Sequence, residues 1–160
     1  MNSRVTDGLL TSAAYGANLT QTRQYDPDTR RTIAVVATAN VSPAPQTTMQ
    51  VITYGYDQVG NVKERYDWID AVDEKYNVDQ LNRLSTVSKW NGDNPRTYTQ
   101  TKAYQYDALG DITSKNDSGT YTYPPAGQPQ PHAVSSVSNA IFGTANYISR
   151  GGYIPWNGPS

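Results

Sequence analysis

The sequence predicts an all-β fold, in which consecutive β-hairpins form one curved, open sheet. First, a turn-like segment recurs along the 160 residues, as in "YGYDQVGNV" (54–62) and "YQYDALGDI" (104–112). Second, the chain has 13 tyrosines but one phenylalanine, and its tyrosine, threonine and valine residues favour strands over helices. Third, the turn copies recur at intervals of 22 and 28 residues, which indicates stacked hairpin units.

The recurring segment has the residues of a hairpin turn. Asp57 and Gly60 suit the first and fourth positions of a type I turn. An aspartate there accepts hydrogen bonds from backbone N–H groups two residues on, and a glycine adopts a positive φ without strain. Tyr54 and Tyr56 share one face of the preceding strand because alternate side chains point the same way. Val62 begins the return strand, so we expect a hairpin loop of about 3–5 residues.

The same turn is predicted at two further places, and more weakly at a third. In "YNVDQLNRL" (76–84) asparagine replaces glycine, and asparagine tolerates the left-handed region best after glycine. A weaker copy, "QYDPDT" (24–29), has a proline and no glycine. The predicted structural turn positions are Asp57, Gly60, Asp79, Asn82, Asp107 and Gly110.

The remaining segments divide the chain into a weakly patterned N-terminal part, residues 1–20, and a β region, residues 21–160. Strands are expected within 30–39, 49–56 and 83–90. Proline-rich loops are expected at 40–48 and 124–131, because proline cannot serve a central strand, and a further loop at 91–95. A helix over 67–81 is the alternative for that segment, but the Asp79 turn and its valine, isoleucine and tyrosine residues favour strands.

Composition argues against several classes of protein. The formal net charge of -1 gives no sign of nucleic-acid binding. No apolar run of about 18 residues predicts a membrane span, and "MNSRVTDGLL" lacks the features of a signal peptide. The absence of cysteine excludes disulfides and thiol-based catalysis or metal sites.

The repeated motif resembles that of the YD-repeat, or Rhs-repeat, family, which is close to Tyr-x-Tyr-Asp-x-x-Gly-[Asn/Arg]-[Leu/Ile/Val]. The segments 54–62 and 104–112 match it well, and 76–84 matches at the Asp, Asn and Leu positions. "YTYPPAGQPQPHAVSSVSNA" (121–140) is similar to a segment of bacterial Rhs proteins, and "NYISRGGYIPWNGPS" (146–160) to a shortened repeat. The resemblance covers residues 20–160.

The resemblance implies a non-enzymatic segment of a spiral of hairpins. In relatives such as Tc toxin complexes, polymorphic toxins and teneurins, many repeats wind into a hollow shell around a toxin or other cargo. The family's self-cleavage sequence, Asp-Pro-x-Gly-Leu, is absent, so a fragment or truncated member is expected. The implied partners are protein cargo and other repeat segments, with self-association through sheet edges, in a secreted, translocated or cell-surface bacterial protein.

No catalytic, cofactor-binding or metal-ligating residue is predicted. The acidic residues Asp67, Asp70, Asp73 and Glu74 lack the spacing and glycine of an EF-hand, so they are expected to be a solvated strand and turn. The motif aspartates are explained by their turns. His132 is the only histidine and cannot form a histidine cluster.

Aromatic residues leave one binding hypothesis open. Trp68, Trp90 and Trp156 could stack on sugars, which would suit a carbohydrate-binding or adhesion module. The alternative is that they pack between strands, where cross-strand aromatic pairs add about 0.2–1 kcal/mol each. A third hypothesis is a degenerate remnant without a present role.

Overall fold

The computed structural model describes residues 3–4, 8–40, 43–139, 143–148 and 152–153, and these contain strands but no helix, so none that could span a membrane. The all-β prediction is confirmed. The strands are β1 (Ser3–Arg4), β2 (Leu10–Tyr15), β3 (Leu19–Tyr25), β4 (Thr32–Ala39), β5 (Thr47–Tyr56), β6 (Val62–Asp67), β7 (Val72–Val78), β8 (Leu84–Trp90), β9 (Tyr98–Tyr106), β10 (Ile112–Lys115), β11 (Gly119–Thr122), β12 (Ser136–Asn139), β13 (Gly143–Ile148) and β14 (Gly152–Tyr153).

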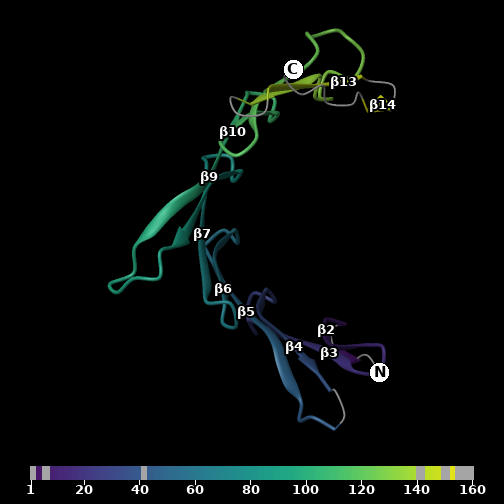
Figure 1. Ribbon diagram of the computed structural model, residues 1–160, viewed down its shortest axis with the longest axis vertical. Helices are drawn as coiled ribbons and strands as arrows, with labels where there is room; N and C mark the ends of the chain where they lie inside the picture. The colour runs from purple at the N-terminus through teal and green to yellow at the C-terminus, as the bar shows by residue number, and fades with distance from the viewer. Residues whose placement is uncertain (1–2, 5–7, 41–42, 140–142, 149–151, 154–160) are drawn as a thin grey trace. The chain divides into compact units, whose positions relative to one another are not determined.

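The chain forms two compact units. The first comprises residues 1–77 and 88–99, and the second comprises residues 78–87 and 100–160. In the first unit, the consecutive strands from β1 to β7 pair antiparallel with one another, from β1 with β2 to β6 with β7 (Figure 1). In the second unit, β9 to β14 pair in the same way. Consecutive hairpins therefore build each unit, as the repeats predict.

Strand boundaries differ from the sequence expectations at a few places. The segment 67–81 folds as the end of β6, a turn and β7, so the helix alternative is wrong. Residues 10–15, which lie within the weakly patterned segment 1–20, form strand β2, and this strand pairs with β3. Strand β5 begins at Thr47, inside the expected loop 40–48, because the prolines of that loop end at Pro45.

Few of the side chains that the structure describes are buried. Among the described residues, the buried apolar side chains are those of Ala13, Ile52 and Val87. Many large apolar side chains are exposed: Tyr15, Leu19, Met49, Val59, Val62, Trp68, Ile69, Leu81 and Leu109. Strand β4, "TIAVVATA", has β-branched residues on both faces, and all its residues are only half-buried. A sheet of this kind leaves apolar area on its surface, which favours contact with a partner.

Candidate functional site

The aspartate of the Asp57 turn makes several hydrogen bonds within the turn. Asp57 Oδ1 accepts hydrogen bonds from the backbone N–H groups of Val59, Gly60 and Asn61 at 3.0, 2.7 and 2.8 Å. The Asp57 N–H donates to the Asn61 carbonyl at 2.9 Å. Gly60 has a φ of 103°, in the left-handed region that glycine adopts most easily.

The Asp79 and Asp107 turns share this geometry. Asp107 Oδ1 accepts from the N–H groups of Leu109 and Asp111 at 2.9 and 3.0 Å, and Gly110 has a φ of 97°. Asp79 Oδ1 accepts from Leu81 and Arg83, both at 2.9 Å, and Asn82 has a φ of 60°. In each of these two turns, a carboxylate oxygen therefore accepts two backbone N–H groups, and the residue three positions after the aspartate has a positive φ.

The Asp26 turn is one residue longer than the other three. Asp26 Oδ1 accepts from the N–H groups of Asp28 and Thr29 at 3.1 and 2.7 Å. The positive φ, 62°, falls on Arg30, four residues after the aspartate instead of three. This insertion explains why the sequence copy at this turn is weak.

The aspartates of three turns, Asp26, Asp57 and Asp79, have pKa values below the ordinary value of an aspartate. The hydrogen bond from the Asn61 side chain is the main cause that lowers the pKa of Asp57. Hydrogen bonds from the backbone N–H of Arg83 and of Thr29 do the same for the pKa of Asp79 and of Asp26. A carboxylate that accepts several N–H groups and has a lowered pKa is a poor general base.

Four tyrosine hydroxyls, at or next to the C-terminal ends of strands, bond to the strand before their own. In the first unit, Tyr25 and Tyr56 donate to the carbonyls of Leu10 and Thr32 at 2.7 and 2.6 Å. In the second unit, Tyr106 and Tyr123 donate to the carbonyls of Leu84 and Ile112, both at 2.8 Å. Each acceptor is the first residue of the preceding strand. The second tyrosine of the motif therefore satisfies its hydroxyl and fixes one hairpin against its neighbour.

An arginine after the turn makes a second connection within each unit. In the second unit, Arg83 pairs with Asp79 (Nε to Oδ2, 2.7 Å), donates to the Asp107 carbonyl at 3.2 Å, and lies 4.5 Å from the Tyr106 ring centre. In the first unit, Arg31 lies over the Tyr56 ring, and a side chain at Gly60 would meet its guanidinium. In the Asp107 turn, Asp111 stands at the position that Arg83 has in the Asp79 turn. Its Oδ2 lies 2.8 Å from Nδ1 of the exposed His132.

Trp68 and Trp90 belong to one aromatic cluster in the first unit. Trp68 is 60% exposed, its ring packs edge-on against Tyr66 at 4.5 Å, and its Nε1 donates to Thr53 Oγ1. The Arg96 guanidinium carbon lies 5.3 Å from the Tyr66 ring centre and 4.8 Å from that of Trp90. The structure thus brings two of the three predicted tryptophans together through Tyr66 and Arg96. Trp156 lies outside the described residues.

Asp73 contacts this cluster through Arg96, and its burial corrects the expectation of a solvated acidic stretch. Its side chain is 0% exposed, and its Oδ2 accepts from Arg96 Nη1 at 2.6 Å and from the Tyr98 hydroxyl at 2.7 Å. Register places Asp73 opposite Tyr66, on the same face of the sheet. Asp67 is also buried, whereas Asp70 is exposed and Glu74 is half-buried. Sequence reasoning missed Arg96 and Tyr98 because they follow Asp73 by 23 and 25 residues.

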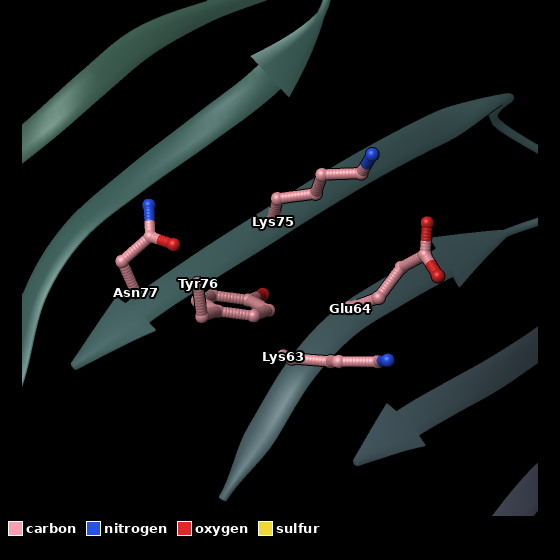
Figure 2. A pocket seen from close by; sticks show the side chains of 5 residues that line it. All are labelled: Lys63, Glu64, Lys75, Tyr76 and Asn77. Carbon is pink, nitrogen blue, oxygen red and sulfur yellow. The ribbon is translucent and has the colours of Figure 1, made fainter. Parts of the chain in front are cut away.

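Figure 2 shows an open groove between β6 and β7, lined by Lys63, Glu64, Lys75, Tyr76 and Asn77, with a volume of about 270 Å³. Burial and a hydrogen bond to Glu74 raise the pKa of Tyr76, so its hydroxyl stays protonated. The groove presents charges of both signs and has room for a small polar group. Among the described residues, no cluster of three or more histidine, aspartate or glutamate side chains could hold a metal ion.

Comparison with solved structures shows a shared fold. A chain in the crystal structure of TcdB2-TccC3-Cdc42 matches 71% of this chain at 22% identity, with a TM-score of 0.55, and the match covers 6% of that chain. A chain in the crystal structure of TcdB2-TccC3-TEV matches to the same extent, with a TM-score of 0.56. A chain in the Photorhabdus luminescens Tc holotoxin pore matches 86% of this chain at 21% identity, with a TM-score of 0.54, over 7% of its own length.

No family model matches the sequence, and no curated protein matches it. This chain spans only 6–7% of the length of those solved chains. Their likeness therefore establishes the hairpin architecture of a segment.

Proposed function

We propose that this chain is a non-catalytic wall segment of a YD-repeat shell, which encloses or scaffolds a toxin or other protein cargo. The observation that carries the proposal is the hairpin sheet itself. Its turns are connected by tyrosine and arginine contacts, and few of its apolar side chains are buried. A wall needs regular connections between hairpins more than it needs a thick core. The likeness to segments of Tc toxin chains supports the same role.

The partners follow from the exposed apolar surface. Val59, Leu81 and Leu109 occupy the same position of three turns and are 70%, 67% and 76% exposed. Nothing in the geometry of a type I turn requires an apolar side chain at that position. We propose that such residues, with unpaired strand edges, contact cargo, other repeat segments or further copies of this chain in a secreted or cell-surface bacterial assembly.

Size-exclusion chromatography with light scattering, over a dilution series of the whole chain, tests the proposal. We expect an average mass above that of the monomer that falls on dilution. Leu109→Lys should lower the mass at a given concentration, whereas Ala108→Lys, in the same exposed turn, should not. A chain that is monomeric at every concentration and melts cooperatively would contradict the open-wall proposal.

A second candidate function is carbohydrate binding, favoured by the exposed Trp68 ring beside Tyr66. Binding to a glycan array that is lost in Trp68→Ala and retained in Trp90→Ala would support it. If the wild-type chain binds no glycan, carbohydrate binding is rejected and the wall function remains.

The wall proposal also predicts that the chain does not cleave itself. A defined cleavage product of the incubated chain, abolished by one aspartate or histidine substitution, would overturn the proposal.

A further inference from the structure

We propose that Asp73, Tyr66, Trp90 and Tyr98 form a receptor for a guanidinium group, which Arg96 occupies within this chain. The inference is independent of the wall function. All five residues belong to the first unit. The ligand class is the arginine side chain or a small alkylguanidinium.

Charge is the first argument. A carboxylate that is 0% exposed is unfavourable unless a cation compensates it. The cation that pairs with Asp73 is Arg96, through Nη1 at 2.6 Å. Lys75 lies two residues away on the same strand, but its ammonium is placed over the Tyr98 ring, 3.9 Å from the ring centre.

Shape selects guanidinium over ammonium. The Arg96 guanidinium carbon lies 5.3 and 4.8 Å from the Tyr66 and Trp90 ring centres. A planar, weakly hydrated cation stacks on aromatic rings, whereas an ammonium is compact and strongly hydrated. Two rings and one carboxylate therefore match a flat cation better than a spherical one.

Unused hydrogen-bonding capacity points to a ligand beyond Arg96. Asp73 Oδ2 accepts both the Arg96 and the Tyr98 donors, while Oδ1 is buried and has no hydrogen-bond partner among the described residues. A carboxylate can accept two parallel N–H bonds from one guanidinium. Arg96, which is tethered to the loop before β9, supplies one. A guanidinium without that tether can supply both.

The loop that carries Arg96 has its own hydrogen bonds. Asn91 N–H and Nδ2 donate to the Thr97 carbonyl and hydroxyl at 3.1 and 2.8 Å. The Thr97 N–H donates to Asp93 Oδ1 at 2.8 Å, and Trp90 Nε1 donates to the Asp93 carbonyl at 3.0 Å. The Arg96 side chain is 49% exposed. Truncating it should therefore open the receptor and leave the loop in place.

Titration of Arg96→Ala with methylguanidinium, followed by tryptophan fluorescence and melting temperature, tests the receptor. We expect saturable binding at millimolar concentration, at least tenfold tighter than that of methylammonium, and a rise in melting temperature. Arg96→Ala with Asp73→Asn should lose this binding. Arg23→Ala, which removes an arginine of β3 that hydrogen-bonds Gln21, is the matched control and should show none.

Equal binding of the two cations, no binding to folded Arg96→Ala, or binding that survives Asp73→Asn would each overturn the proposal. If Arg96→Ala does not fold, Arg96→Lys receives the same titration. Methylguanidinium should then raise its melting temperature more than methylammonium does, and equal or absent effects would overturn the receptor.

Discussion

Two aspartates of the first unit, Asp57 and Asp73, differ in where their carboxylates find hydrogen-bond donors. Asp57 lies in a turn and accepts N–H groups from residues two to four positions ahead. Asp73 is fully buried in a strand and depends on Arg96 and Tyr98, which are 23 and 25 residues away. A local motif can therefore be copied from hairpin to hairpin, whereas the Asp73 contacts exist only where the strands bring distant residues together.

The largest expected effect comes from breaking the distant contact. Arg96→Met leaves the buried carboxylate of Asp73 without its cation, so it should lower the free energy of unfolding more than any of the turn variants below. Asp73→Leu together with Arg96→Met removes both charges and should recover most of that loss. Urea denaturation of the single and double variants measures both values. A double variant no more stable than the single one would show that Asp73 is not compensated mainly by Arg96.

A smaller loss is expected from the backbone of a turn. Gly110 has a φ of 97° and open space around it, so Gly110→Val should cost about 1–2 kcal/mol through backbone strain alone. Gly55→Ala is the control, because Gly55 lies in β5 and an added Cβ would make ordinary contact with Glu64 at 3.5 Å. Thermal melting should show a clear decrease for Gly110→Val and little change for Gly55→Ala. Equal melting temperatures would contradict a left-handed Gly110.

The turn aspartate itself should tolerate a change of charge better than a loss of oxygen. Asp57→Asn keeps an acceptor for the N–H groups of the turn, whereas Asp57→Leu leaves those groups without one. We expect Asn to be mild and Leu more destabilising, with both below the Arg96→Met effect. Asn and Leu variants of equal stability in urea would show that the side-chain hydrogen bonds do not hold the turn.

The smallest effect is a dependence on pH. The folded-state pKa values of Asp57 and Asp79 lie below the ordinary value of 3.8. Their contribution to stability is therefore complete above that value and is lost as the pH falls through the lowered pKa. Urea midpoints of the wild type should fall between about pH 5 and about pH 2, and those of Asp57→Asn should fall less. Parallel pH profiles would mean that Asp57 does not contribute.

The strand-rich class and the positions of the turns could be predicted from the residues alone. Aspartate, a left-handed residue at Gly60, Asn82 or Gly110, and alternating tyrosines act within a few residues, so their spacing alone predicts the hairpins. The tyrosine-rich composition also predicts that the tyrosine hydroxyls have hydrogen-bond partners, because a buried hydroxyl is usually hydrogen-bonded. Their acceptors, such as the Thr32 carbonyl for Tyr56, lie 24 residues away and were not predictable.

The burial of particular polar side chains depends on how the strands pair and pack. Asp70 and Asp73 stand three residues apart in one acidic segment, yet the first is exposed and the second is 0% exposed. The difference arises because β7 pairs in a register that sets Asp73 beside Tyr66, and because Arg96 and Tyr98 then cover it. Burial depends on what lies across the sheet, and a carboxylate in sequence carries no sign of a cation 23 residues later.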